Sequence, residues 1–146
     1  MTSQNNAEPI WHNAYPTPRF DAPRMSPDEL AELVKTKVAG RDYIVVDVRR
    51  TDFENVFIKG ALNLPAHTFY PTRETIVKVL STIPIVVFHC SSCGPTGRGP
   101  RTAGWYRAEL EKQGIDEAQS SARVLDGGIK LFAERYANDA SLVSKP

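Results

Sequence analysis

The segment between residues 85 and 101 joins an apolar run, a loop of small residues and the beginning of a helix. Five residues that suit a buried strand, Ile85-Val86-Val87-Phe88-His89, lead directly into Cys90. The sequence Ser-Ser-Cys-Gly-Pro-Thr-Gly-Arg-Gly-Pro-Arg follows, and a helix-favouring stretch comes after it. A buried strand that continues through a loop into a helix is the unit from which parallel α/β sheets are built. The segment therefore places Cys90 at the carboxyl end of a strand, where such sheets bind ligands.

The residues after Cys90 predict an oxyanion-binding loop with a reactive thiol, which we call the thiol loop (residues 90–98). Backbone N–H groups at a helix N-terminus point toward a common position and add partial positive charge there. The same potential favours a thiolate and lowers the pKa of a cysteine. A packing cysteine is the alternative, but small and cationic neighbours make a poor core. The expected catalytic residues are Cys90 and Arg98, and the expected substrate-binding residues are Ser91, Ser92, Cys93, Gly94, Thr96, Gly97 and Arg101.

Length and composition indicate one globular domain, because 146 residues bury about 68–70% of the surface that the unfolded chain exposes. The 18 basic and 17 acidic side chains give a net charge of +1, which does not support nucleic-acid or membrane-surface binding. Two cysteines three positions apart exclude a disulfide-built scaffold. The N-terminal residues lack the apolar core of a signal peptide, and no apolar run is long enough to span a membrane. We therefore expect a soluble protein of the cytosol, the nucleus or both.

Strand-like and helix-like patterns alternate along the chain. They predict strands at 43–48, 85–89 and 123–125, and a glycine turn followed by a short strand within 57–65. Helices are predicted at 27–36, 72–80, 101–113 and 129–136. This order predicts an α/β fold with a mostly parallel central sheet flanked by helices on both faces.

The sequence divides into a proline-rich N-terminal arm (1–24), a domain (25–138) and a C-terminal tail (139–146). The prolines of the arm exclude a helix and favour extended backbone. Its three isolated aromatic residues, Trp11, Tyr15 and Phe20, suggest packing across the domain surface; a free tail and a partner-binding segment are the alternatives.

Several blocks between residues 27 and 136 are similar to those of rhodanese homology domains. They are Asp28-Glu29-Leu30, Val45-Val46-Asp47-Val48-Arg49, Ile58-Lys59-Gly60-Ala61-Leu62-Asn63-Leu64-Pro65, Val87-Phe88-His89-Cys90 and Leu125-Asp126-Gly127-Gly128. Within that fold, His89-Cys90 followed by Arg98-Gly99-Pro100-Arg101 resembles the cell-cycle dual-specificity phosphatases and the eukaryotic arsenate reductases. The resemblance implies a rhodanese-like fold, Cys90 as the nucleophile and Arg98 as the oxyanion clamp.

The spacing of the thiol loop departs from the pattern of both relatives. Seven residues separate Cys90 from Arg98, whereas the phosphatase pattern has two fewer. In an alternative register, Cys93 to Arg98 has the length of a sulfurtransferase loop, with Cys93 as the nucleophile. We favour Cys90, because it stands at the strand end where the family places its nucleophile.

Other residues near the thiol loop leave alternatives open. Cys93 either resolves an oxidised or arsenylated Cys90 through a local disulfide, or its spacing is a coincidence. His89 either helps to lower the pKa of Cys90 or is structural. Asp47 is a candidate to orient the loop, and Asp126 before two glycines suits a turn. No metal site is expected, because the two cysteines and three histidines (His12, His67 and His89) show no second ligand pair at zinc spacing.

These features predict a cysteine-dependent enzyme that acts on a tetrahedral oxyanion, either phosphatase-like or arsenate reductase-like, through a covalent Cys90 intermediate. The expected substrates are phosphate, arsenate or a phosphoprotein. No cofactor is expected beyond an external thiol reductant for arsenate reduction, which implies a thiol-redox partner. The residue that protonates a leaving group is not assigned. The alternatives are a sulfurtransferase that works through a cysteine persulfide, and a catalytically weak rhodanese binding module.

Overall fold

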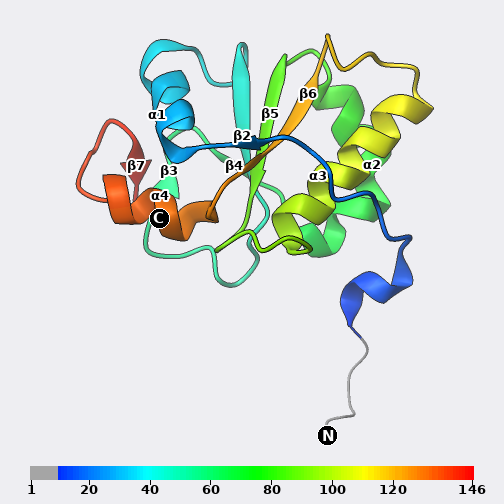
Figure 1. Ribbon diagram of the computed structural model, residues 1–146, viewed down its shortest axis with the longest axis horizontal. Coiled ribbons are helices and arrows are strands. Elements are labelled where there is room, and N and C mark those ends of the chain that lie inside the picture. The colour runs from blue at the N-terminus through cyan, green and yellow to red at the C-terminus, as the bar shows by residue number, and fades with distance from the viewer. Residues whose placement is uncertain (1–9) are drawn as a thin grey trace, which may run out of the picture.

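A five-stranded parallel sheet forms the centre of the computed structural model, which describes residues 10–146 (Figure 1). The order across the sheet is β1-β6-β5-β2-β4. The strands are β1 (Arg24–Met25), β2 (Tyr43–Asp47), β4 (Leu62–Asn63), β5 (Ile85–His89) and β6 (Ser121–Leu125). The predicted α/β class and mostly parallel sheet are therefore confirmed.

Strands β2 and β5 lie side by side in the middle of the sheet and end together. Their register pairs Val46 with Phe88 and Asp47 with His89. Every residue of β2 is buried, as expected for a continuous apolar run that is covered on both faces. The shared end of the two strands brings the segment after Asp47 next to Cys90, and Val48 N–H donates to the His89 carbonyl at 2.9 Å.

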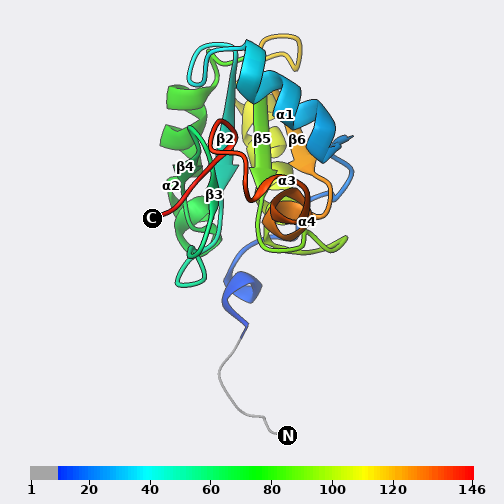
Figure 2. The ribbon, with the colours of Figure 1, turned by 90° about the vertical axis from the view of Figure 1, so that its left-hand side faces the viewer.

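Helices cover both faces of the sheet. Figure 1 shows α1 (Pro27–Thr36) and α4 (Gly128–Tyr136) on one side and α2 (Ala66–Leu80) and α3 (Arg98–Lys112) on the other, and Figure 2 looks onto α1 and α4. Alternate strand residues serve two cores. One core, on the α2–α3 side, contains Val46, Phe69, Phe88, Trp105, Tyr106 and Leu110. The other, on the α1–α4 side, contains Leu30, Val45, Val87, Ile129 and Phe132.

The helix boundaries show where local sequence signals correctly predicted the start of a helix and where they did not. Helix α1 begins and ends as predicted, because Ser26 and Glu29 form a capping box, with contacts of 3.1 and 2.9 Å, around Pro27. Helix α2 begins at Ala66 rather than Thr72, with Pro71 inside it. Ala66 and Phe69 are buried in its first turns, so tertiary packing outweighs the missing N–H of the proline.

The described part of the arm packs against α2 and α3. Trp105 Nε1 donates to the Pro16 carbonyl at 2.8 Å, and Tyr15 stacks on Tyr70 with ring centroids 5.0 Å apart. The expectation that prolines exclude a helix was wrong at Trp11–Ala14, which form the short 3-10 helix η1 and contain no proline. Residues 1–9, also assigned to the arm, lie outside the described part of the chain.

The C-terminal segment, expected to be a tail, is part of the folded domain. Strand β7 (Val143–Ser144) pairs antiparallel with β3 (Phe57–Ile58). Leu142, just before β7, is fully buried in the core on the α1–α4 side. The apolar Leu142-Val143 pair was too short to signal a strand by its periodicity. Between residues 10 and 146, none of the helices has both the length and the apolar character needed to cross a membrane.

Leu142→Ala is expected to lower the free energy of unfolding by about 2–5 kcal/mol, because it leaves a cavity in a closed core. Denaturant unfolding followed by circular dichroism measures the change. Val79→Ala is the matched control, because Val79 is 64% exposed and its truncation should change stability by less than about 0.5 kcal/mol. Equal stability of Leu142→Ala and the wild type would contradict the assignment of residues 139–146 to the core.

Candidate active site

The thiol loop leaves the carboxyl end of β5 and runs into the N-terminus of α3. Cys90 follows His89 directly and is 5% exposed. Helix α3 begins at Arg98, three residues earlier than predicted, with Gly97 as its N-cap. Arg98 therefore occupies the first helical position, and the amides of the first turn of α3 point back toward the loop.

Two free thiols lie close together inside the loop. Cys90 Sγ and Cys93 Sγ are 3.6 Å apart, and both residues are buried. The amide of Gly99 donates to Cys90 Sγ at 3.4 Å, and the amide of Cys90 donates to Cys93 Sγ at 3.3 Å. Cys93 has a φ of 52°, in the left-handed region, which turns the chain so that its side chain folds back beside Cys90. This loop therefore holds a dithiol rather than a single cysteine.

The two thiols have opposite protonation preferences. The hydrogen bond from the Cys93 thiol, the Gly99 amide and the charge of Arg98 together lower the pKa of Cys90 to about 5, although burial acts in the other direction. The same hydrogen bond to Cys90 and burial raise the pKa of Cys93 well above its usual range. Cys90 is thus the thiolate at neutral pH, and Cys93 is its proton-bearing neighbour.

Close packing against the backbones of α3 and α4 fixes the position of the thiol loop. A Cβ at Gly99 would lie 2.8 Å from Cys93 Sγ, so only glycine allows α3 to approach the dithiol this closely. A Cβ at Gly128, whose φ is +60°, would lie 2.5 Å from the Ser91 carbonyl oxygen. The amides that follow in α4 donate to the Cys90 carbonyl at 3.1 Å and to the Ser91 carbonyl at 2.9 Å. The N-terminus of α4 therefore anchors the start of the thiol loop.

Arg98 lies beside the dithiol, but its guanidinium fork holds Asp52. Arg98 Nη1 and Nη2 donate to the two carboxylate oxygens of Asp52 at 2.9 and 2.6 Å. Ser91 Oγ also donates to Asp52, at 2.9 Å. The Arg98 guanidinium and the Ser91 hydroxyl hold the pKa of Asp52 well below its usual range, so this carboxylate stays ionised. Sequence analysis missed Asp52, because it lies 46 residues from Arg98 in an unremarkable polar stretch.

The remaining predicted loop residues have different positions. Ser92, Gly94 and Thr96 are exposed, and the Gly97 amide closes a turn onto the Gly94 carbonyl at 3.0 Å. Arg101 is 7% exposed and donates to the Thr96 carbonyl at 3.4 Å. Its guanidinium also lies 5.1 Å from the ring centre of Phe20. Arg101 therefore ties the loop to the arm, and its contacts do not support the expected role as a second charge on the substrate.

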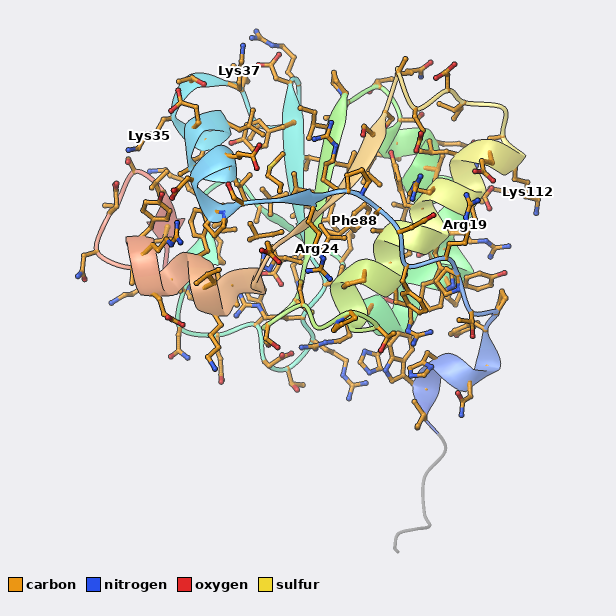
Figure 3. The ribbon with its side chains drawn as sticks, viewed as in Figure 1. Arg19, Arg24, Lys35, Lys37, Phe88 and Lys112 are labelled. Carbon is orange, nitrogen blue, oxygen red and sulfur yellow. The ribbon has the colours of Figure 1, made fainter. Side chains whose placement is uncertain are left out.

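Another arginine, Arg24, supports the loop from β1. Its Nη1 donates to the Cys93 carbonyl at 3.2 Å and to Asp126 at 3.3 Å, and Figure 3 shows it reaching from β1 toward the loop. Asp126, assigned to a turn, also serves as the ion-pair partner of Arg24. Sequence analysis did not identify Arg24, because nothing local marks a residue of the arm as a neighbour of Cys93.

His89 and Asp47 are fully buried behind the loop. His89 Nδ1 donates to the Cys90 carbonyl at 2.9 Å, and His89 Nε2 lies 3.6 Å from Asp47. These contacts favour the structural role for His89. Asp47 pairs with Arg49 at 2.8 Å instead of contacting the thiol loop. Among residues 10–146, no three His, Cys, Asp or Glu side chains gather in a group that could hold a metal ion.

The parallel sheet with a cysteine at the end of its central strand β5 agrees with the family to which the sequence is matched. Residues 26–135 match the rhodanese-like domain family, and the chain belongs to it. Arsenical-resistance protein 2 of Saccharomyces cerevisiae is 28% identical over 110 residues, which cover 70% of this chain and 82% of that protein. The predicted fold and family are confirmed.

Two solved structures share the fold at low sequence identity. Ygr203w, described as a yeast protein tyrosine phosphatase of the rhodanese family, has a TM-score of 0.66 and 20% identity, and the match covers 85% of this chain and 92% of that one. The As-Sb reductase from Leishmania major has a TM-score of 0.65 and 24% identity, with 82% of each chain covered.

Cys93→Ala is expected to raise the pKa of Cys90, because it removes the thiol that donates to the Cys90 sulfur. In the wild type, alkylation of Cys90 by iodoacetamide should be half-maximal near pH 5, the value at which the thiolate forms. In the variant the midpoint should move to higher pH. Cys93→Ser keeps an O–H donor and should lie between the two. Rates mapped to Cys90 by peptide mass spectrometry decide the matter, and an unchanged midpoint in Cys93→Ala would contradict this account.

Proposed function

We propose that this protein is an arsenate reductase in which Cys90 attacks arsenate and Cys93 supplies the second thiol. The observation that carries the proposal is the 3.6 Å separation of the two sulfurs, one with a lowered pKa and the other with a raised pKa. Reduction of arsenate to arsenite consumes two electrons, and two thiols release two electrons when they form a disulfide. Hydrolysis of a phosphate ester needs one thiolate and water, so a second buried thiol has no part in it.

The first step is attack by the Cys90 thiolate on the arsenic of arsenate. A sulfur–arsenic bond forms, and one arsenate oxygen leaves as water after taking up protons from the solvent. The amides at the N-terminus of α3 and the Arg98 guanidinium would stabilise the oxyanion during this step. Ordering of the nucleophile by the Gly99 amide, at 3.4 Å from Cys90 Sγ, lowers the cost of reaching that geometry.

In the second step Cys93 attacks Cys90 Sγ. The sulfur–sulfur bond forms, the sulfur–arsenic bond breaks with its electron pair passing to arsenic, and the proton of Cys93 goes to the departing arsenite. The hydrogen bond to Cys90, then burial and then the negative charge of Cys90 raise the pKa of Cys93. The charge of Cys90 disappears once its sulfur is bonded to arsenic, and the hydrogen bond to that sulfur weakens with it. Cys93 therefore becomes easier to deprotonate when it is needed. An external thiol, supplied by a thiol-redox partner, then reduces the disulfide.

The comparisons agree with this assignment in part. Arsenical-resistance protein 2 and the As-Sb reductase carry names that point to arsenic chemistry. Ygr203w is described as a tyrosine phosphatase, which supports phosphoester hydrolysis as the second candidate. Against the second candidate, the nearby acid Asp52 has a strongly lowered pKa and is unsuited to protonate a leaving group.

The sulfurtransferase alternative is weaker, because the shorter loop register requires Cys93 to be the reactive thiolate. The pKa of Cys93 is raised, and among residues 10–146 the Cys90 amide, at 3.3 Å, is the one backbone donor to its sulfur. A reactive thiol needs a lowered pKa and positive surroundings, which Cys90 has.

Without an external reductant, the wild type should convert about one arsenate per chain and stop with Cys90 and Cys93 joined, as the two-thiol stoichiometry requires. Arsenite measured by chromatography and the disulfide mapped by mass spectrometry test this. Cys90→Ser should be inactive, because its hydroxyl stays protonated. Cys93→Ser should lose the reductant-free turnover.

Aryl phosphate hydrolysis and thiosulfate:cyanide sulfur transfer are measured in parallel on the same variants. Faster hydrolysis of aryl phosphate than reduction of arsenate, with no dependence on Cys93, would establish the phosphatase instead. Sulfur transfer that survives Cys90→Ser but not Cys93→Ser would establish the shorter register.

Arg98→Lys should lower kcat/KM for arsenate by roughly tenfold or more, because a lysine keeps the charge but loses the bidentate fork. Stability should change little, since the Arg98 side chain is 26% exposed and pairs with a partly exposed acid. Steady-state kinetics beside thermal melts test both expectations. The control is Arg107→Lys, which alters an arginine in the middle of α3 that pairs with Asp21 on the surface. Equal kcat/KM in Arg98→Lys and wild type would remove Arg98 from the site.

A further inference from the structure

The carboxylate of Asp52 accepts hydrogen bonds from the side chains that would be expected to bind the oxyanion, Arg98 and Ser91. Both terminal nitrogens of Arg98 and the hydroxyl of Ser91 donate to it, at 2.9, 2.6 and 2.9 Å. Arg98 Nη2 also lies 3.3 Å from Ser91 Oγ, so the three side chains form one closed cluster. Arginine binds carboxylates and tetrahedral oxyanions through the same planar fork. Asp52 therefore stands where an anion would bind.

Asp52 is presented by a built segment, the Asp52 loop (residues 48–56). The Arg50 amide donates to Asp52 Oδ1 at 3.0 Å, which closes a local turn. The buried Arg49 donates to the carbonyls of Asp52 at 3.2 Å and of Val56 at 3.0 Å. By contrast, the surface pair Arg19–Glu111 has one contact between side chains that are 64% and 67% exposed. The Asp52–Arg98 contact is therefore fixed by the hydrogen bonds of the Asp52 loop, unlike a pair of exposed side chains on the surface.

We infer that Asp52 competes with the oxyanion for Arg98 and Ser91, and is thereby a specificity-determining residue of the site. An entering anion must replace the fork contacts and the hydroxyl contact, and it must do so against the charge of the carboxylate. A tetrahedral oxyanion has enough oxygens to take over all of these donors. A halide or a ligand with a single oxygen does not, so the site rejects it.

The inference concerns the site of the proposed function and rests on it only in taking the ligand to be an oxyanion. The opposing role for Asp52 is that of a positioning residue that holds Arg98 ready for the ligand. The two roles predict opposite signs. Removal of a competitor frees Arg98 and strengthens anion binding, whereas removal of a positioning group weakens it.

Asp52→Asn tests the sign, because the amide oxygen still accepts from the Arg50 amide while the negative charge is lost. Asp52→Ser is a second variant with a smaller acceptor. The matched control is Asp21→Asn, which removes a carboxylate paired with Arg107 at 2.7 Å on the surface. Thermal melts confirm that all three variants are folded.

The first readout is the ratio of Cys90 alkylation rates with iodoacetate and iodoacetamide, mapped by peptide mass spectrometry. The reagents differ by one negative charge, so the ratio reports the positive potential at Cys90 and needs no turnover. We expect it to rise about three- to tenfold in both Asp52 variants, the size expected for one freed, partly exposed arginine. It should not change in Asp21→Asn.

The second readout is protection of Cys90 from iodoacetamide by inorganic phosphate. The half-protecting concentration should fall by a similar factor in the Asp52 variants. An unchanged or lower iodoacetate ratio, or weaker protection by phosphate in the Asp52 variants, would overturn the proposal in favour of a positioning role. The absence of protection by phosphate in every variant, the wild type included, would instead overturn the competition and the proposed function together, because neither stands if the site binds no oxyanion.

Discussion

The buried ion pair between Asp47 and Arg49 determines how the segments around the active site are held. Asp47 is fully buried at the end of β2, and Arg49 follows two residues later with a 4% exposed side chain. Removing two charges from water costs several kcal/mol per ion, and the attraction between them offsets this cost only when the remaining donors and acceptors are also hydrogen-bonded. Arg49 meets this condition through Asp47 and the carbonyls of Asp52, Glu54 and Val56. The pair thus converts the polar segment after β2 into a defined loop that reaches the end of β5.

Helices and strands could be predicted from the sequence wherever the local sequence pattern and the tertiary contacts favoured the same structure. The apolar runs of β2 and β5 predicted buried parallel strands, and the capping box at Ser26 predicted the start of α1. The position of Cys90 at a strand end followed from the same reasoning. What failed depended on contacts between distant residues. Helix α2 extends through Pro71 because its first turns are buried, and β7 exists because β3 lies beside it.

The site itself was predictable only in the residues that share the thiol loop. Cys90, Cys93 and Arg98 are close in sequence, and the strand-loop-helix pattern brings them together. Asp52 and Arg24 reach the loop from 46 and 69 residues away, through pairings that no local pattern encodes. The contacts of Arg101 were not predictable for a similar reason, because the aromatic ring beside its guanidinium belongs to the arm. The role of a charged side chain near a predicted anion site therefore cannot be assigned from the sequence until its hydrogen-bond and ion-pair partners are known.

The two residues by which the thiol loop exceeds the phosphatase spacing provide room for a second sulfur. Cys93 adopts a left-handed backbone conformation that costs roughly 1–3 kcal/mol for a residue with a side chain. The structure compensates by hydrogen bonding its sulfur to the Cys90 amide and its carbonyl to Arg24. Gly99 contributes by leaving space next to that sulfur. The Cys93 thiol donates its proton to the Cys90 thiolate, so each group shifts the pKa of the other. A reaction at Cys90 therefore changes the reactivity of Cys93 directly. In the arsenate reduction proposed above, the longer loop would thereby hold the nucleophile Cys90 and the reducing thiol of Cys93 within one hydrogen bond.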